Sequence, residues 1–256
     1  MSTDDSNTMT ETPTETDDRP SVLVPLEILE GQTLPDGVPE LLANAHVVLL
    51  GYHVLPEQTP PGQARLQFEE RAQRKLGEFE TTLESAGATV ERRLVFTHDG
   101  QQTIDRTIAE HECLAVLVPN ACEPPEDLLV AIRGTVGIDR MATLLTGLFA
   151  DTDVELTLYH ALVEEETDDD ADAFLDGVTD RLVEGGFDRS AIDRLIEGEG
   201  ASVDRIADLA EKYDAVVMGE SDPSVATFVF GMPSKQVAER FLGPVLVVER
   251  EDANED

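Results

Sequence analysis

The stretch "VVMGESDPSVATFVFGMPSKQVAERFLGPVLVV", residues 216–248, decides the fold class of this chain. It begins with an apolar, β-branched run that ends on Gly219, passes through a loop with a second glycine, Gly231, and becomes helical in pattern after Ser234. A further apolar run, 244–250, follows the helical pattern. A glycine-bearing loop between a strand and a helix is typical of parallel α/β sheets, where backbone N–H groups and the helix N-terminus favour a phosphate.

The same alternation of strand and helix patterns extends outward from this stretch through most of the chain. Apolar, β-rich runs predict strands at 21–26, 46–55, 89–96, 113–119, 127–132, 154–162, 190–198, 214–219 and 244–250. Amphipathic or polar segments between them predict helices at 38–45, 64–87, 100–111, 137–151, 170–186, 202–213 and 233–242. Strands separated by helices predict right-handed βαβ units and a parallel sheet.

This series of elements occurs twice, which indicates an internal duplication. The first copy has only "NACEPPED" after residue 119, where the second has a glycine loop, a helix and a strand. The sequence therefore predicts two doubly wound, Rossmann-like α/β domains in tandem, 20–125 and 126–250, the first truncated. Residues 1–19 and 251–256 are predicted to be acidic tails, the first of them disordered because it has almost nothing apolar to bury.

The charge balance is strongly acidic, with 54 Asp and Glu against 18 Lys and Arg and a formal charge of −36. Acidic residues also dot the helical segments 68–80, 164–184 and 203–211, so no single tail explains the excess. We expect a halophilic protein in a salt-rich cytoplasm, where screening suppresses self-repulsion. Nucleic-acid binding is disfavoured because it needs a basic surface. We also expect no membrane insertion, since no apolar run approaches the roughly 20 residues that a spanning helix needs.

The cysteines and histidines do not form a familiar catalytic or metal-binding motif. Cys113 and Cys122 are nine residues apart, which fits neither a redox pair nor a zinc site. Cys113 lies in "CLAVLV" and is predicted to be a small core residue. His53 in "GYHVL" and His160 in "LYHAL" are expected at matching places of the two copies, as structural histidines whose hydrogen bonds are satisfied. No metal is predicted.

The ending of the chain carries a family resemblance. "DRIADLAEKYDA" before the glycine loop, "VVMG" at 216–219, "FG" at 230–231 and "SKQVAERFLGPVLVV" at 234–248 resemble the universal stress protein family. The first half is similar through "SVLVPL" and "HVVLLGYHVLPE", so the resemblance covers 21–250. It implies a doubly wound fold that binds adenine nucleotides.

The phosphate motif of that family, G-x2-G-x9-G-[S/T], is only partly kept. The resemblance implies that Gly219, Gly231 and Ser234 are what remains of the nucleotide-binding residues. Asp222 stands where the second glycine of the motif belongs. Eight residues, instead of nine, lie between Asp222 and Gly231, and Met232 stands where the motif has Ser or Thr. A carboxylate about 5 Å from a phosphate costs roughly 1 kcal/mol in watery surroundings and more when desolvated. We therefore expect a degenerate site and no bound cofactor, with ATP binding as the alternative.

Family members also place an aspartate after the first strand to meet the adenosine. Arg133 stands there in the second copy and Glu27 in the first. The leading hypothesis is a non-enzymatic stress-response regulator or interaction module. The alternative is a weak ATP or AMP binder that switches with nucleotide. An enzyme of the same superfamily is less favoured, because it would need an intact phosphate loop.

The final strand prompts a prediction about assembly. The first copy has no final strand, so the outer edge of 244–250 is expected to lack a partner within the chain. Exposed apolar edges favour pairing with another chain. We therefore predict a homodimer that pairs through 244–250, and leave open an unknown protein partner.

Overall fold

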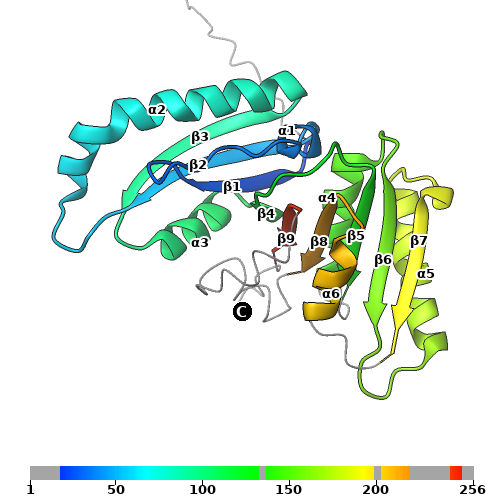
Figure 1. Cartoon of the computed structure of the whole chain (residues 1–256). Helices are drawn as coiled ribbons and strands as arrows, with labels where there is room; N and C mark the ends of the chain where they lie inside the picture. The colour runs from blue at the N-terminus through cyan, green and yellow to red at the C-terminus, as the bar shows by residue number, and fades with distance from the viewer. Residues whose placement is uncertain (1–17, 133–136, 199–202, 220–242, 250–256) are drawn as a thin grey trace, which may run out of the picture.

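The computed structural model describes residues 18–132, 137–198, 203–219 and 243–249. In these residues nine strands form one sheet (Figure 1). The strands are β1 (Ser21–Glu27), β2 (His46–Val54), β3 (Thr89–Thr97), β4 (Ala115–Val118), β5 (Asp127–Ile132), β6 (Glu155–Ala161), β7 (Ile192–Glu197), β8 (Ala215–Gly219) and β9 (Val245–Val248). Every strand that the hydrophobic pattern predicts is present, with small shifts at the ends.

The helices between the strands also follow the sequence pattern. They are α1 (Val38–Leu41), α2 (Pro61–Ala86), α3 (Gly100–Glu110), α4 (Ile138–Phe149), α5 (Asp168–Glu184) and α6 (Val203–Ala210), with one 3-10 turn at Arg189–Ala191. Gly87 ends α2 with a φ of 121°, a backbone conformation that favours glycine. The predicted helix 233–242 lies outside the described residues.

The strand order is the same in both copies. The sheet order is β3-β2-β1-β4-β9-β8-β5-β6-β7, and the neighbours within each copy are parallel. Each copy thus places its second and third strands on one side of its first strand and its fourth strand on the other. This confirms the predicted fold class: two doubly wound parallel units in tandem, the first without its fifth strand, which here share one nine-stranded sheet.

Strand β9 joins the two copies. It pairs in parallel with β8 of its own copy and antiparallel with β4 of the first copy, with Val116 opposite Val247. The expectation that 244–250 has a free outer edge is therefore wrong. Because the truncated first copy has no strand to follow β4, the edge of β4 is open, and β9 fills it. The homodimer predicted through 244–250 loses its structural basis, since β9 already has a neighbour on each side.

Helices cover both faces of the sheet (Figure 1). On one face, α1, α2, α4 and α5 pack on the strands of both copies. Their buried side chains form a single cluster that includes Leu76, Leu145 and Leu175. On the other face α3 and α6 cover separate clusters, one in each copy. The shared core and shared strand make the copies one packed body. None of the described helices combines the length and apolar character that crossing a membrane requires.

Candidate functional site

The carboxyl ends of β5, β6, β7 and β8 meet at one edge of the second copy. These strands are parallel neighbours, so Ile132, Ala161, Glu197 and Gly219 end them at the same side. The strand order reverses at β5, because β6 lies on one side of it and β8 on the other. Open α/β sheets bind ligands at this kind of switch point. The second copy therefore presents its candidate ligand site beside the end of β5.

Only one predicted site residue can be placed at that edge. Gly219 ends β8 and pairs with Val248 of β9. Gly231 and Ser234 lie outside the described residues, as do Asp222 and Arg133. The prediction of a degenerate phosphate loop thus remains a prediction.

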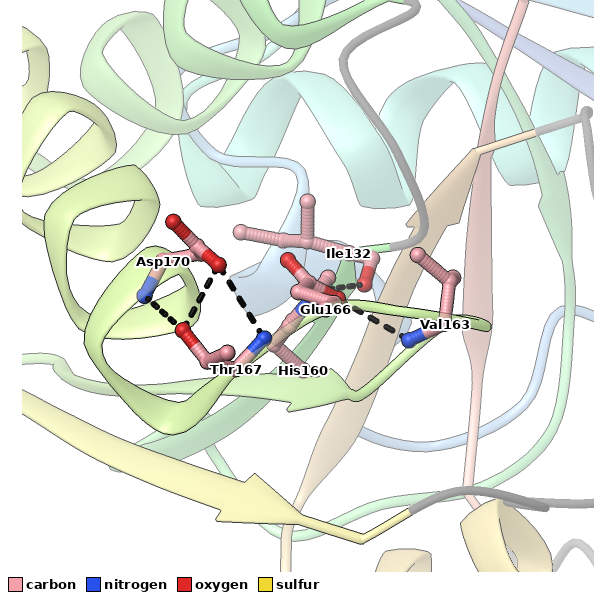
Figure 2. A network of polar contacts seen from close by, with 6 residues as sticks. All are labelled: Ile132, His160, Val163, Glu166, Thr167 and Asp170. Atoms are coloured by element: carbon pink, nitrogen blue, oxygen red, sulfur yellow. Dashed lines mark hydrogen bonds and ion pairs between the residues drawn. The ribbon is translucent and has the colours of Figure 1, made fainter.

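A buried histidine organises the carboxyl end of β6 (Figure 2). His160 is 2% exposed, and its Nδ1 lies 3.0 Å from the carbonyl oxygen of Ile132 on the neighbouring strand β5. Its Nε2 lies 3.0 and 3.1 Å from the two carboxylate oxygens of Glu166. Both ring nitrogens are therefore used, which confirms for His160 the expected structural role. The network ties the start of the β6–α5 loop to the end of β5.

Glu166 accepts a second hydrogen bond, which favours its ionised form. The backbone N–H of Val163 donates to Glu166 Oε2 at 2.9 Å. This N–H, and then the His160 imidazole, holds the pKa of the Glu166 carboxyl below its ordinary value. Hydrogen bonds to an ionised carboxylate favour the charged form. Nothing in the sequence pattern singles out Glu166, although it lies only six residues after His160.

The acidic run after Glu166 caps helix α5 (Figure 2). Thr167 Oγ1 accepts from the backbone N–H of Asp170, and the Asp170 carboxylate accepts from the backbone N–H of Thr167 at 3.1 Å. This capping box satisfies two N–H groups that a helix start leaves free. The acidic run is therefore the first turn of helix α5.

Tyr159, Glu197 and Arg205 form the second polar group at this edge. The Tyr159 hydroxyl lies 3.2 Å from Glu197 Oε2, and Arg205 Nε lies 2.8 and 2.9 Å from the same carboxylate. Burial, followed by the Glu197 charge, raises the pKa of Tyr159 to about 12. The phenol therefore stays protonated at neutral pH and acts as a donor that fastens β6 to β7.

The two cysteines are unreactive in character. Cys113 is fully buried, and burial raises the pKa of its thiol to about 11. Cys122 is half-buried, and burial likewise raises its thiol pKa to about 11. Neither forms a disulfide. The prediction that Cys113 is a core residue is confirmed, and thiolate chemistry is unfavourable at both positions.

The histidines His53 and His160 do not occupy matching places. Val47 of β2 and Leu156 of β6 occupy equivalent positions. In each copy, this residue pairs with a residue of the copy's first strand. That first-strand residue also pairs, on its other side, with the alanine that begins the copy's fourth strand. His53 lies six residues beyond Val47, whereas His160 lies four beyond Leu156. The expectation of matching positions is wrong by two residues. His53 sits nearer the carboxyl edge than His160 does.

His53 also lacks a hydrogen bond that was expected of it, on one ring nitrogen. Its Nδ1 is buried and has no hydrogen-bond partner among the described residues. Its ring meets the edges of Phe68 and Phe96 at centroid distances of 6.3 and 6.4 Å. Near it, Glu27 ends β1 and Glu30 follows in the next turn. The sequence pattern points to Glu27 and His53 separately, and no local signal indicates that Glu30 lies beside them.

Comparison with known proteins identifies the fold. No protein-family model and no curated protein matches the chain. A solved universal stress protein from Archaeoglobus fulgidus DSM 4304 is similar over 92% of this chain and 97% of its own, with a TM-score of 0.63 and 18% identity. This likeness shows that the chain has the fold of that universal stress protein, along nearly its whole length.

Two further structures are similar more distantly. A protein of unknown function from Pseudomonas aeruginosa PAO1 covers 92% of this chain and 94% of its own, at a TM-score of 0.46 and 16% identity. A universal stress protein from Archaeoglobus fulgidus in complex with dAMP covers 48% of this chain and 97% of its own, at a TM-score of 0.37 and 19% identity.

Proposed function

We propose that this chain is a tandem member of the universal stress protein family and acts as a non-enzymatic regulatory or interaction module of the stress response. The observation that carries the proposal is the fold, shared over 92% of the chain with a universal stress protein. The residues at 216–219 and 234–248 that resemble the family ending support the same assignment. A cytoplasmic location, adapted to high salt, is part of this proposal.

We propose no catalytic activity because of how the polar side chains are engaged and because the phosphate loop is incomplete. At the described edge of the second copy, the polar side chains are engaged with one another: His160 with Glu166, and Tyr159 with Glu197. Groups engaged in this way hold the strand ends together. The sequence lacks an intact phosphate loop, which a nucleotide-processing relative would need.

The test is nucleotide binding in concentrated salt. Full-length protein in about 2 M KCl, where surface repulsion is screened, would be titrated with ATP and AMP by calorimetry, and analysed for co-purified nucleotide. We expect no binding in the micromolar range. Micromolar affinity would favour the alternative, a nucleotide-responsive universal stress protein. The end of β8 at the switch point of the sheet is the observation that favours this alternative.

A loop variant would identify what weakens the site. Asp222→Gly combined with Met232→Ser removes the carboxylate and supplies a hydroxyl, so we expect ATP affinity to rise at least about tenfold. Asp252→Gly, which removes one carboxylate from the tail, is the matched control and should leave affinity unchanged. An unaltered affinity in the double variant would attribute the loss to the shortened loop.

A further inference from the structure

Three metal-ligating side chains converge at the carboxyl edge of the first copy. One ligand atom from each of Glu27, Glu30 and His53 lies within 4.8 Å of the other two. Glu27 ends β1, Glu30 lies in the following turn, and His53 is near the end of β2. The strand order of the first copy reverses at β1, with β2 on one side and β4 on the other. The three residues therefore stand at the switch point of the first copy, where open α/β sheets hold ligands.

The ring of His53 is held by apolar packing and left without polar contacts on one nitrogen. Phe68 and Phe96 flank it, and its buried Nδ1 has no hydrogen-bond partner in the described part of the chain. His160 in the second copy differs, since both of its nitrogens are engaged. A buried polar atom without a partner is destabilising and calls for an explanation. A nitrogen of a neutral imidazole that carries no hydrogen bond is free to ligate a metal ion.

The two carboxylates near this ring are not neutralised by a cation of the protein. Among the described residues, no Lys or Arg forms an ion pair with Glu27 or Glu30. The ammonium of Lys75 donates to the backbone carbonyl of Gln32, two residues after Glu30. Two unpaired carboxylates beside an imidazole form a site of net negative charge. Such a site attracts a cation that both oxygen and nitrogen can ligate.

We propose that Glu27, Glu30 and His53 bind a divalent transition-metal ion of the Zn²⁺ or Mn²⁺ class. Imidazole nitrogen favours this class over Mg²⁺ and Ca²⁺, which prefer oxygen ligands alone. With metal–ligand distances near 2.0–2.2 Å, the ligand atoms must approach one another to about 3.3 Å. Glu30 is exposed in a turn and can make this small movement. Three protein ligands leave coordination positions for water.

This inference does not depend on the proposed function, although Glu27 stands where family members place the residue that meets the adenosine. The site uses no residue of the glycine loop and belongs to the copy that lacks one. It also contradicts the sequence-based prediction that the protein binds no metal. That prediction rested on neighbouring ligands along the chain, whereas these residues come from the end of β1, the turn that follows it and the adjacent strand β2.

The experiment is metal titration of the full-length protein by calorimetry, with Zn²⁺ and separately Mn²⁺, in about 2 M KCl with excess Mg²⁺ so that diffuse binding to the acidic surface is screened. We expect one tight site. His53→Gln and Glu27→Gln should each lower its affinity at least about tenfold. His98→Gln, which changes an exposed histidine just beyond β3, is the control and should bind like the wild type.

A spectroscopic readout separates binding from folding. Co²⁺ in the site should give visible absorption bands that are lost in His53→Gln and kept in His98→Gln. Glu30→Gln, a change at an exposed turn, covers the case in which the other variants fail to fold. It should fold normally and bind more weakly. Absence of a single site in the wild type, or equal affinity in His53→Gln or Glu30→Gln, would overturn the proposal.

Discussion

Gly37 allows the segment after β4 of the truncated first copy to pack closely against the rest of that copy. Its φ is 81°, and a Cβ placed on it would lie 2.2 Å from the carbonyl oxygen of Cys122 and 2.7 Å from Cys122 Sγ. Cys122 lies in the short segment that replaces the missing loop, helix and strand, and its N–H donates to the carbonyl of Asp36. The connection between the copies can therefore pack closely only because residue 37 has no side chain.

Gly37→Ala should destabilise the protein by about 3 kcal/mol or more, because it combines a left-handed backbone cost of roughly 1–2 kcal/mol with a steric clash. The measurement is the free energy of unfolding by denaturant in high salt. Gly31→Ala is the control, since Gly31 has a φ of 87° and no atom near its Cβ position. Equal losses in the two variants would mean that the contact with Cys122 contributes nothing.

Glu166 supplies a pH-dependent contribution to stability. Its folded-state pKa is lowered, first by the Val163 N–H and then by His160, so the contribution is full above the ordinary carboxyl pKa of 4.5. It is lost as the pH falls through the lowered pKa. Glu166→Gln should cost about 1 kcal/mol at neutral pH and nothing in acid below that pKa.

The measurement is the difference in unfolding free energy between wild type and Glu166→Gln across the acid range. The difference cancels the general effect of protonating a highly acidic surface. Glu164→Gln, a change at an exposed neighbour, should show no such dependence. A difference that stays constant from neutral to acid pH would show that the carboxylate charge is not involved.

At the scale of elements, β9 is the strand on which both copies depend. All four of its residues are buried, and it pairs with β4 on one side and β8 on the other. A strand with two neighbours uses each backbone N–H in the sheet, and proline cannot supply one. An edge strand would tolerate the same change.

Val247→Pro should therefore destabilise the whole protein by about 1–3 kcal/mol or more, because it leaves a buried carbonyl of the sheet without its donor. Val247→Ala keeps the N–H and should lose only packing, so it serves as the control. Circular dichroism with denaturant titration in high salt measures both. A stably folded Val247→Pro protein with altered mass in sedimentation would instead support the earlier idea of a dimer through this edge.

At the scale of the whole molecule, the charge of −36 sets the conditions for folding. Carboxylates spread over helices repel one another in dilute buffer, and the ion pairs that the structure describes are mostly exposed, as in Arg74 with Glu70. Exposed pairs contribute little to stability. Screening by salt should matter more than these pairs do.

The melting temperature should accordingly rise by several degrees between about 0.1 M and 2 M KCl. A variant with Asp168→Asn, Asp169→Asn and Asp172→Asn, which keeps the capping residue Asp170, should depend less on salt. Thermal melts by circular dichroism give both values. Identical melting temperatures in the two salt concentrations would remove the argument for a halophilic protein.

The order and type of the elements could be predicted from the sequence alone. Alternating apolar runs and amphipathic segments specified every described strand, and Gly87 specified the end of α2, because these signals are local. The duplication and the lost end of the first copy were also readable, since they are patterns along one chain. The resemblance of 234–248 to the family ending pointed to the fold that the comparison then identified.

Only the tertiary structure decided which distant segments meet. The open edge of β4 and the strand β9 are more than a hundred residues apart, and no local pattern says that they pair. The same holds for Glu27 and His53, which belong to different strands, and for the register that separates His53 from His160. Pairing between strands depends on packing and on the edges left open by the rest of the fold, which are properties of the assembled sheet.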